Sequence, residues 1–265
     1  MLVGNSHLVK NFQELVRRGK LAHGYIFFGE PGVGKFYFVK HLAYFLEEGK
    51  FEISRRPLQD SLVIDSAFGI DTMREVKNFL WQKPAISKKR LAIINDADSL
   101  TEEAQNAILK ITEEPPEHAA VILIASQIDN LLPPLASRLQ KIYFGIASDE
   151  ELKLLGASKE LLAAGYGRPG RIALLSRKDA LFDQARRYAE QFLLASGKAR
   201  SNLIKELVEA QKEAPKLIDY FFEELLVGLR QDAVKNAGLI RSVLHRLFLI
   251  KSYNTNKRLQ IEAIA

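Results

Sequence analysis

The stretch Gly29-Glu30-Pro31-Gly32-Val33-Gly34-Lys35-Phe36 decides how this chain folds. It follows the pattern G-x-x-x-x-G-K of a phosphate-binding loop, whose glycines let backbone N–H groups surround phosphate oxygens while the lysine reaches the outer phosphates. The pattern continues with Ser or Thr, whose hydroxyl binds Mg²⁺. Phe36 has no oxygen to offer, so the sequence predicts a nucleotide cradle that lacks one contact to the metal.

The segments on both sides of the loop support this interpretation. Residues 25–28 are a short apolar run of strand-forming residues, which is typical of a buried strand. Residues 35–48 carry apolar side chains at helical spacing. A strand, the loop and a helix in direct succession are the context that the motif requires, so the match rests on more than its fixed residues.

Strands and helices alternate through the first half of the chain. Short apolar runs predict strands at 62–64, 90–94 and 121–125, and apolar periodicity predicts helices at 8–20, 71–82 and from Thr101 to Pro115. Such alternation predicts an α/β fold with a parallel sheet and right-handed crossovers. Ligands of these sheets bind at the carboxyl ends of the strands, where the glycine loop lies.

The pattern changes after about residue 146, where the remaining sequence is helical without clear strands. We therefore predict three parts. These are a phosphate-loop NTPase-like domain at 1–146, a small helical lid at 147–178 and an all-helical C-terminal domain at 179–265.

A second contact to the metal is expected at the end of a neighbouring strand. In AAA+ ATPases an aspartate there binds Mg²⁺ and the glutamate beside it orients the attacking water. Here the strand at 90–94 is followed by Asn95 and Asp96. If Asp96 takes the place of the glutamate, Asn95 replaces the aspartate and brings no negative charge. The alternative register, which places Asp96 or Asp98 on the metal, stays open.

Two more polar positions are candidates for phosphate chemistry. Ser126 follows the strand at 121–125 and could contact a γ-phosphate, although a serine there often only solvates the strand end. Ser137 and Arg138 follow soon after, and most arginines at such positions are ordinary surface residues. In this fold Arg138 is also a candidate arginine finger, which stabilises the transition state of phosphoryl transfer in a neighbouring subunit.

Composition limits the class of protein. The 265 residues are 47% hydrophobic and 26% charged, as in ordinary globular proteins. The absence of cysteine excludes disulfides and thiolate zinc sites. No apolar run approaches the ~20 residues of a membrane span, and the first residues lack a signal-peptide pattern. A cytoplasmic protein without membrane association is expected. The net charge of +6 is only weak support for binding to nucleic acid.

Several segments together resemble the AAA+ clamp-loader subunits of bacterial DNA polymerase III, and among them the delta-prime type. The resemblance is carried by residues 21–27, 29–35, 96–98, 104–116 and 137–138. Two features favour delta-prime over the gamma/tau motor type. One is the degenerate phosphate loop, and the other is the segment 167–170, where motor subunits carry arginine in a Gly-x-x-Arg pattern. The four-cysteine zinc module of the family is absent, so no zinc is predicted.

The resemblance implies a function for the whole chain. A delta-prime subunit resembles a rigid stator within a pentamer that loads a sliding clamp on primed DNA, with gamma/tau and delta subunits as partners. It implies a C-terminal oligomerisation collar, weak or absent ATP binding through Lys35, little or no ATPase activity, and Arg138 supplied in trans with Ser137 beside it. The nucleotide-site candidates are Gly29, Gly32, Gly34, Lys35, Phe36, Asn95, Asp96 and Ser126.

Two other functions fit parts of the sequence. A gamma/tau-like motor subunit that tolerates Phe36 would hydrolyse ATP in a manner that depends on Lys35. A DNA-binding module acting alone would bind DNA tightly and in a salt-sensitive manner. The basic clusters at 17–20 and 88–90 are too short to favour the latter.

Overall fold

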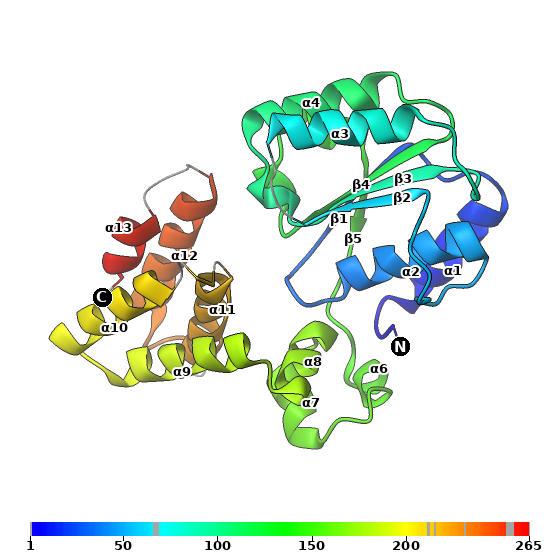
Figure 1. Ribbon diagram of the computed structural model, residues 1–265. Coiled ribbons are helices and arrows are strands. Elements are labelled where there is room, and N and C mark those ends of the chain that lie inside the picture. The colour runs from blue at the N-terminus through cyan, green and yellow to red at the C-terminus, as the bar shows by residue number, and fades with distance from the viewer. Residues whose placement is uncertain are drawn as a thin grey trace. The chain divides into compact units, whose positions relative to one another are not determined.

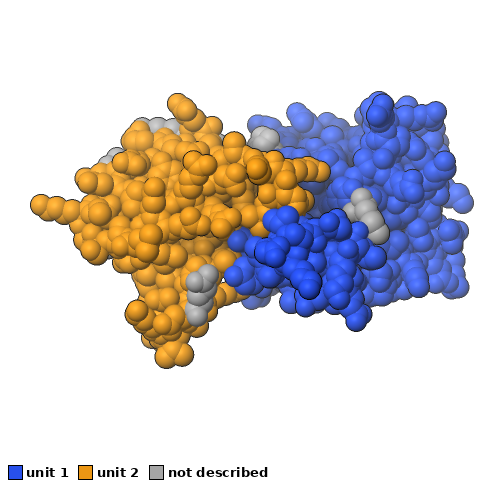
Figure 2. All heavy atoms as spheres, turned by 90° about the horizontal axis from the view of Figure 1, so that it is seen from below, with its two compact units in different colours: residues 1–172 blue, residues 173–265 orange. Residues whose placement is uncertain are grey.

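A computed structural model of the chain describes residues 2–65, 69–210, 213–214, 216–230, 232–252 and 257–264. Internal contacts divide the chain into two compact units, residues 1–172 and residues 173–265 (Figure 2). The boundary between the units falls inside the lid predicted at 147–178. The division of the chain into three parts therefore stays a prediction.

The first unit is built on a parallel sheet of five strands in the order β2-β3-β4-β1-β5 (Figure 1). The strands are β1 (Gly24–Phe28), β2 (Ser61–Ile64), β3 (Arg90–Ile94), β4 (Ala119–Ala125) and β5 (Gln140–Tyr143). All neighbouring strands pair in parallel. This confirms the predicted α/β fold, in which the glycine loop follows an interior strand.

Side chains of each strand alternate between two hydrophobic cores, one on each face of the sheet. In β1, Ile26 faces one core, while Tyr25 and Phe27 face the other. The first core packs under α3 (Ile70–Trp81) and α4 (Glu102–Glu113), and the second packs under α1 (Ser6–Arg17) and α2 (Lys35–Glu48) (Figure 1). Coverage of both faces explains why the strands read as nearly continuous apolar runs.

Two elements differ from the sequence prediction by more than two residues at one end or were missed. The helix expected at 8–20 is α1, which begins at Ser6 and ends at Arg17. It ends early because Gly19 adopts a left-handed conformation with φ of 66°, and the N–H groups of Gly19 and Lys20 then bond back to Val16 and Leu15. Strand β5 was not predicted, since its residues are mostly exposed at the sheet edge and leave no apolar run.

The remaining helices follow along the chain after β4. They are α5 (Pro133–Arg138), α6 (Asp149–Lys153), α7 (Lys159–Gly165), α8 (Pro169–Arg177), α9 (Ala180–Leu194), α10 (Lys198–Ala210), α11 (Leu217–Arg230), α12 (Ala237–Ser252) and α13 (Lys257–Glu262). Helices α9 to α13 share one core that includes Phe192, Phe221 and Leu225. Within the described parts of the chain, every helix is too short or too polar to span a membrane.

The connection from α2 to β2 is short and fixed by side chains. Glu47 near the end of α2 accepts hydrogen bonds from the backbone N–H groups of Gln59 and Asp60 at 2.9 and 3.0 Å. The ring of Phe51 packs against Phe38, with 5.5 Å between the ring centroids. Carboxylate and aromatic contacts therefore organise the connection, where the sequence predicts no zinc because it contains no cysteine.

Asp60, just before β2, is fully buried and organises the loop that leads into β3. Its carboxylate accepts hydrogen bonds from the backbone N–H groups of Ala85, Ile86 and Ser87, each at 2.7 Å. Burial raises the pKa of Asp60, but these hydrogen bonds outweigh it, so the pKa lies below its usual value. The ionised carboxylate is thus part of the folded state.

The single tryptophan of the chain, Trp81, ends α3 in the first unit. Its side chain is 42% exposed, and the ammonium group of Lys77 lies 5.3 Å from its ring centroid. The loop fixed by Asp60 begins directly after it.

Candidate functional site

The glycine loop connects β1 to α2 at the carboxyl end of the sheet (Figure 1). Gly32 and Gly34 have φ of 80° and 99°, in the left-handed region that favours glycine. Lys35 is buried, and its ammonium group donates to the backbone carbonyl oxygens of Gly29 and, at 2.9 Å, of Glu30. The lysine that the motif reserves for phosphate thus binds carbonyl groups of its own loop.

The first position of the loop, Gly29, must be glycine for a structural reason that is independent of phosphate binding. Gly29 has φ of 138°, and a Cβ atom there would lie 2.2 Å from the carbonyl oxygen of Phe144. Phe144 follows β5, the strand that the sequence did not predict. Glycine is therefore required here by the close approach of another backbone segment, whether or not a phosphate binds.

Phe36 occupies the first turn of α2, where the motif expects a hydroxyl group. Its side chain is half-buried and packs against the core formed under α1 and α2. The ammonium group of Lys40, one turn later, lies 4.6 Å from the centroid of its ring. The ring therefore has packing partners within the protein.

The two residues after β3, Asn95 and Asp96, have different hydrogen-bond partners. The side-chain N–H of Asn95 donates to the carboxylate of Asp65 at 2.8 Å, and Asp96 accepts a bond from the hydroxyl of Ser99 at 2.8 Å. Asp65 follows β2 and was not singled out in the sequence. Its carboxylate lies beside the amide that replaces the expected aspartate.

Asp98 has a structural role. Its carboxylate is buried and accepts hydrogen bonds from the backbone N–H of Ser126 at 2.6 Å and from the side chain of Asn130 at 2.8 Å. The carbonyl oxygen of Ser126 in turn accepts a bond from the N–H of Gly29 at 3.3 Å. Ser126 thus links the end of β4 both to Asp98 and to the glycine loop.

The start of α8 packs directly against the glycine loop. The backbone N–H of Gly170 donates to the carbonyl oxygen of Gly32 at 2.8 Å. A Cβ atom on Gly170 would lie 2.9 Å from that same oxygen, so no side chain fits at this position without movement. The side chain of Arg168, just before α8, is buried beside Gly32. The glycine loop and the start of α8 therefore pack directly against each other.

Replacement of Gly170 by alanine is expected to destabilise the first unit by about 1–3 kcal/mol, because the added methyl group overpacks the contact with Gly32. The matched control is Gly238→Ala near the start of α12, where a Cβ atom meets nothing within 4 Å. Urea unfolding of both variants measures the difference. Equal stability of the two variants would contradict the packed contact between α8 and the loop.

Ser137 and Arg138 lie apart from these residues, at the end of α5. The hydroxyl of Ser137 donates to the carbonyl oxygen of Pro134 at 2.9 Å. The guanidinium of Arg138 forms an ion pair with Glu113 at the end of α4, with 3.1 Å between Nη1 and Oε1. The side chain of Arg138 is 41% exposed, so it can reach an anion on another molecule.

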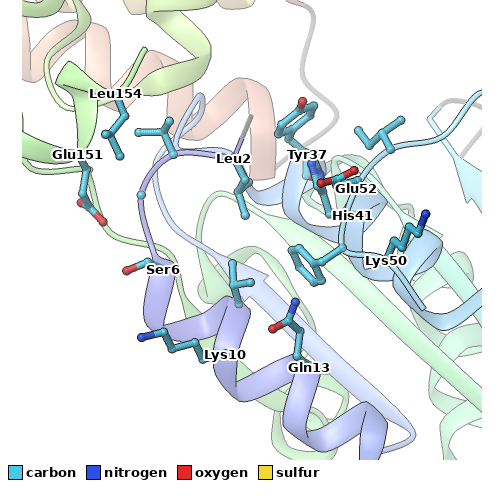
Figure 3. A pocket seen from close by; sticks show the side chains of 15 residues that line it. Leu2, Ser6, Lys10, Gln13, Tyr37, His41, Lys50, Glu52, Glu151 and Leu154 are labelled. Atoms are coloured by element: carbon cyan, nitrogen blue, oxygen red, sulfur yellow. The ribbon is translucent and has the colours of Figure 1, made fainter. Parts of the chain in front are cut away.

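A separate pocket of about 1040 Å³ lies between α1, α2 and the segment after α2 (Figure 3). Lys10 lines it from α1, Tyr37 and His41 from α2, and Leu154 from the end of α6. Burial lowers the pKa of His41, whose Nδ1 donates to the carbonyl oxygen of Tyr37 at 2.8 Å. None of the described residues of the glycine loop, 29–35, lines the pocket, so it is distinct from the phosphate site.

The site residues divide into two groups. Those of the glycine loop, Asn95, Asp96 and Ser126 gather at the carboxyl ends of β1, β3 and β4, which are neighbours in the sheet. Arg138 with Ser137 forms the second group. Among the described residues, no cluster of three or more His, Asp or Glu side chains is placed to hold a metal ion.

The five-stranded parallel sheet with the glycine loop after β1 is a fold of the phosphate-loop NTPase type, as in AAA+ proteins. A RuvB mutant from Thermotoga maritima shares this fold, with a TM-score of 0.50 at 13% sequence identity over 77% of this chain and 71% of that chain. Residues 4–147 match the family described as DNA polymerase III, delta subunit, and the chain belongs to this family.

Two curated relatives carry related names. DNA polymerase III subunit tau of Bacillus subtilis is 25% identical over 282 residues, which cover 85% of this chain and 49% of the relative. DNA polymerase III subunit gamma/tau of Mycoplasma genitalium is 27% identical over 254 residues, covering 83% of this chain and 42% of the relative. The chain thus spans about half the length of the curated relatives it matches.

Proposed function

We propose that this chain is a non-motor subunit of a DNA polymerase III clamp loader. In this role it acts as a stator that supports loading of a sliding clamp on primed DNA, together with gamma/tau and delta subunits. It contributes Arg138 to the nucleotide site of a neighbouring gamma/tau subunit. Membership of the delta-subunit family supports the assembly, and the state of the glycine loop supports the non-motor role.

The main support for the non-motor role is that other groups of the same chain form hydrogen bonds with the glycine loop. Lys35 binds the carbonyl groups of Gly29 and Glu30, and the carbonyl of Gly32 accepts a bond from Gly170. A nucleotide would have to displace these contacts. The position where motor subunits carry an arginine is Gly170 here, and the contact with Gly32 leaves no room for a side chain.

The expected metal contacts are also weakened. Phe36 offers no oxygen, and Asn95 is an amide whose N–H group already binds Asp65. Without these ligands Mg²⁺ lacks the partners that neutralise charge during phosphoryl transfer. We therefore expect weak or absent ATP binding and little or no hydrolysis by this chain.

Arg138 would act on the nucleotide site of a neighbouring subunit and not on the site of its own chain. Its planar guanidinium suits the bidentate binding of phosphate oxygens. An arginine supplied in trans stabilises the charge that develops on the transferred phosphoryl group. The exposed position at the end of α5 is compatible with this role.

The proposal is tested by measuring ATP binding and hydrolysis with Mg²⁺, first for the purified chain and then for its mixture with gamma/tau and delta subunits of the same organism. We expect no turnover by the chain alone and higher turnover in the mixture than without this chain. Turnover by the chain alone that Lys35→Ala abolishes would instead identify a motor subunit. The names of the relatives, tau and gamma/tau, favour this motor as the second candidate.

A further inference from the structure

We propose that Glu113 positions Arg138 for its action on a neighbouring subunit, an inference that rests on the proposed function. Glu113 is the last residue of α4, and Arg138 is the last residue of α5. Their side chains meet in the ion pair between Oε1 and Nη1 at 3.1 Å. They lie far apart in sequence, and the packing of α5 against α4 brings them together.

The backbones that carry these two residues are firmly anchored. The side-chain oxygen of Gln105 in α4 accepts a hydrogen bond from the backbone N–H of Leu132 at 2.7 Å. Leu135 of α5 is fully buried in the same core as Ile111 of α4. Only the outer parts of the side chains of Glu113 and Arg138 are therefore left to move. A contact between them restricts the long arginine side chain at low cost.

The electrostatic setting favours this contact. The carboxyl end of α4 carries the negative pole of the helix dipole, and Glu113 adds negative charge there. A guanidinium is attracted to such a position. Because the side chains of Glu113 and Arg138 are 46% and 41% exposed, the ion pair itself is weak and contributes little to stability.

The ion pair with Glu113 leaves N–H donors of the Arg138 guanidinium available for a phosphate group. An arginine side chain has five N–H donors, and the carboxylate of Glu113 engages one nitrogen, Nη1. The other donors are not used by Glu113 and can bind a phosphate oxygen of a nucleoside triphosphate. Glu113 would thus hold the side chain extended at the end of α5, so that less conformational entropy is lost when Arg138 binds the transition state of phosphoryl transfer in the neighbouring subunit.

The test uses the reconstituted complex of this chain with gamma/tau and delta subunits. Glu113→Ala is expected to lower the kcat of ATP turnover by about 2- to 10-fold, the range for ordering one long side chain, with KM for ATP unchanged. Glu113→Gln should retain most of the activity, because its amide oxygen still accepts from Nη1. Glu114→Ala, the adjacent exposed glutamate, is the matched control and should behave as the wild type.

A second measurement is independent of turnover. In the free chain, ¹⁵N relaxation of the Arg138 side chain should show greater mobility in Glu113→Ala than in the wild type or in Glu113→Gln. One outcome is that Arg138→Ala abolishes the increase in ATP turnover that this chain causes in the complex, while Glu113→Ala matches the wild type in kcat and in the mobility of the Arg138 side chain. That result overturns the role of Glu113 and leaves the proposed function standing. If Arg138→Ala has no effect, the proposed function itself fails.

Discussion

Replacement of Arg138 by alanine is expected to reduce ATP turnover by the assembled loader about 10³-fold, the effect of removing an arginine finger. The reason is that the guanidinium would stabilise charge that develops only in the transition state, so its loss lowers kcat far more than it changes nucleotide binding. The measurement is steady-state hydrolysis by the complex of this chain with gamma/tau and delta subunits, with clamp and primed DNA present.

Two control variants separate chemistry from folding. Arg138 is exposed and its ion pair with Glu113 is weak, so the chain should keep its stability without it. Arg138→Lys should recover little activity, because an ammonium group cannot replace the planar guanidinium. Arg55→Ala, at another exposed arginine, should leave turnover unchanged. A loader that keeps its full rate with Arg138→Ala does not use this residue as a finger.

Replacement of Asp60 by alanine is expected to destabilise the first unit by about 3–5 kcal/mol, because it removes the buried, charged acceptor of three backbone hydrogen bonds at once. The affected donors are those of Ala85, Ile86 and Ser87. The matched control is Asp71→Ala, which removes an exposed ion pair with Arg74 and should cost less than about 1 kcal/mol. Urea unfolding measures both variants, and similar losses for the two would contradict the role of Asp60.

The effect of Asp60 should also depend on pH. Because its pKa is lower in the folded than in the unfolded chain, its stabilisation is present above the unfolded pKa of about 4 and is lost as the pH falls through the folded pKa. The difference in unfolding free energy between wild type and Asp60→Ala should therefore be constant near neutral pH and shrink in acid. A difference that does not change with pH would show that the carboxylate's charge is unimportant.

Strands and helices could be predicted from the sequence where their burial produces a local pattern of apolar residues. Strands β1 and β4 are interior strands covered on both faces, so their apolar runs stand out, and α2 was predicted with its observed bounds at 35–48. Strand β5 escaped prediction because an edge strand with exposed side chains has no such run. The parallel α/β fold could thus be predicted from the interior strands and the glycine loop alone.

Parts of the site could not be predicted because they depend on contacts between distant segments. The approach of Gly170 to Gly32 and the pairing of Arg138 with Glu113 follow from how α8 and α5 pack, which no local pattern encodes. Asp65 was missed because a lone aspartate after a strand is common. The roles of Asn95, Asp96 and Ser126 in nucleotide chemistry stay predictions.

The position of Trp81 gives the molecule a built-in optical label for one of its two units. Because it is the single tryptophan of the chain, tryptophan emission reports on the first unit and contains no signal from the second. Circular dichroism, in contrast, sums over the helices of both units. A melting curve recorded by both methods would therefore reveal whether the helical C-terminal unit unfolds together with the AAA+ domain or separately from it.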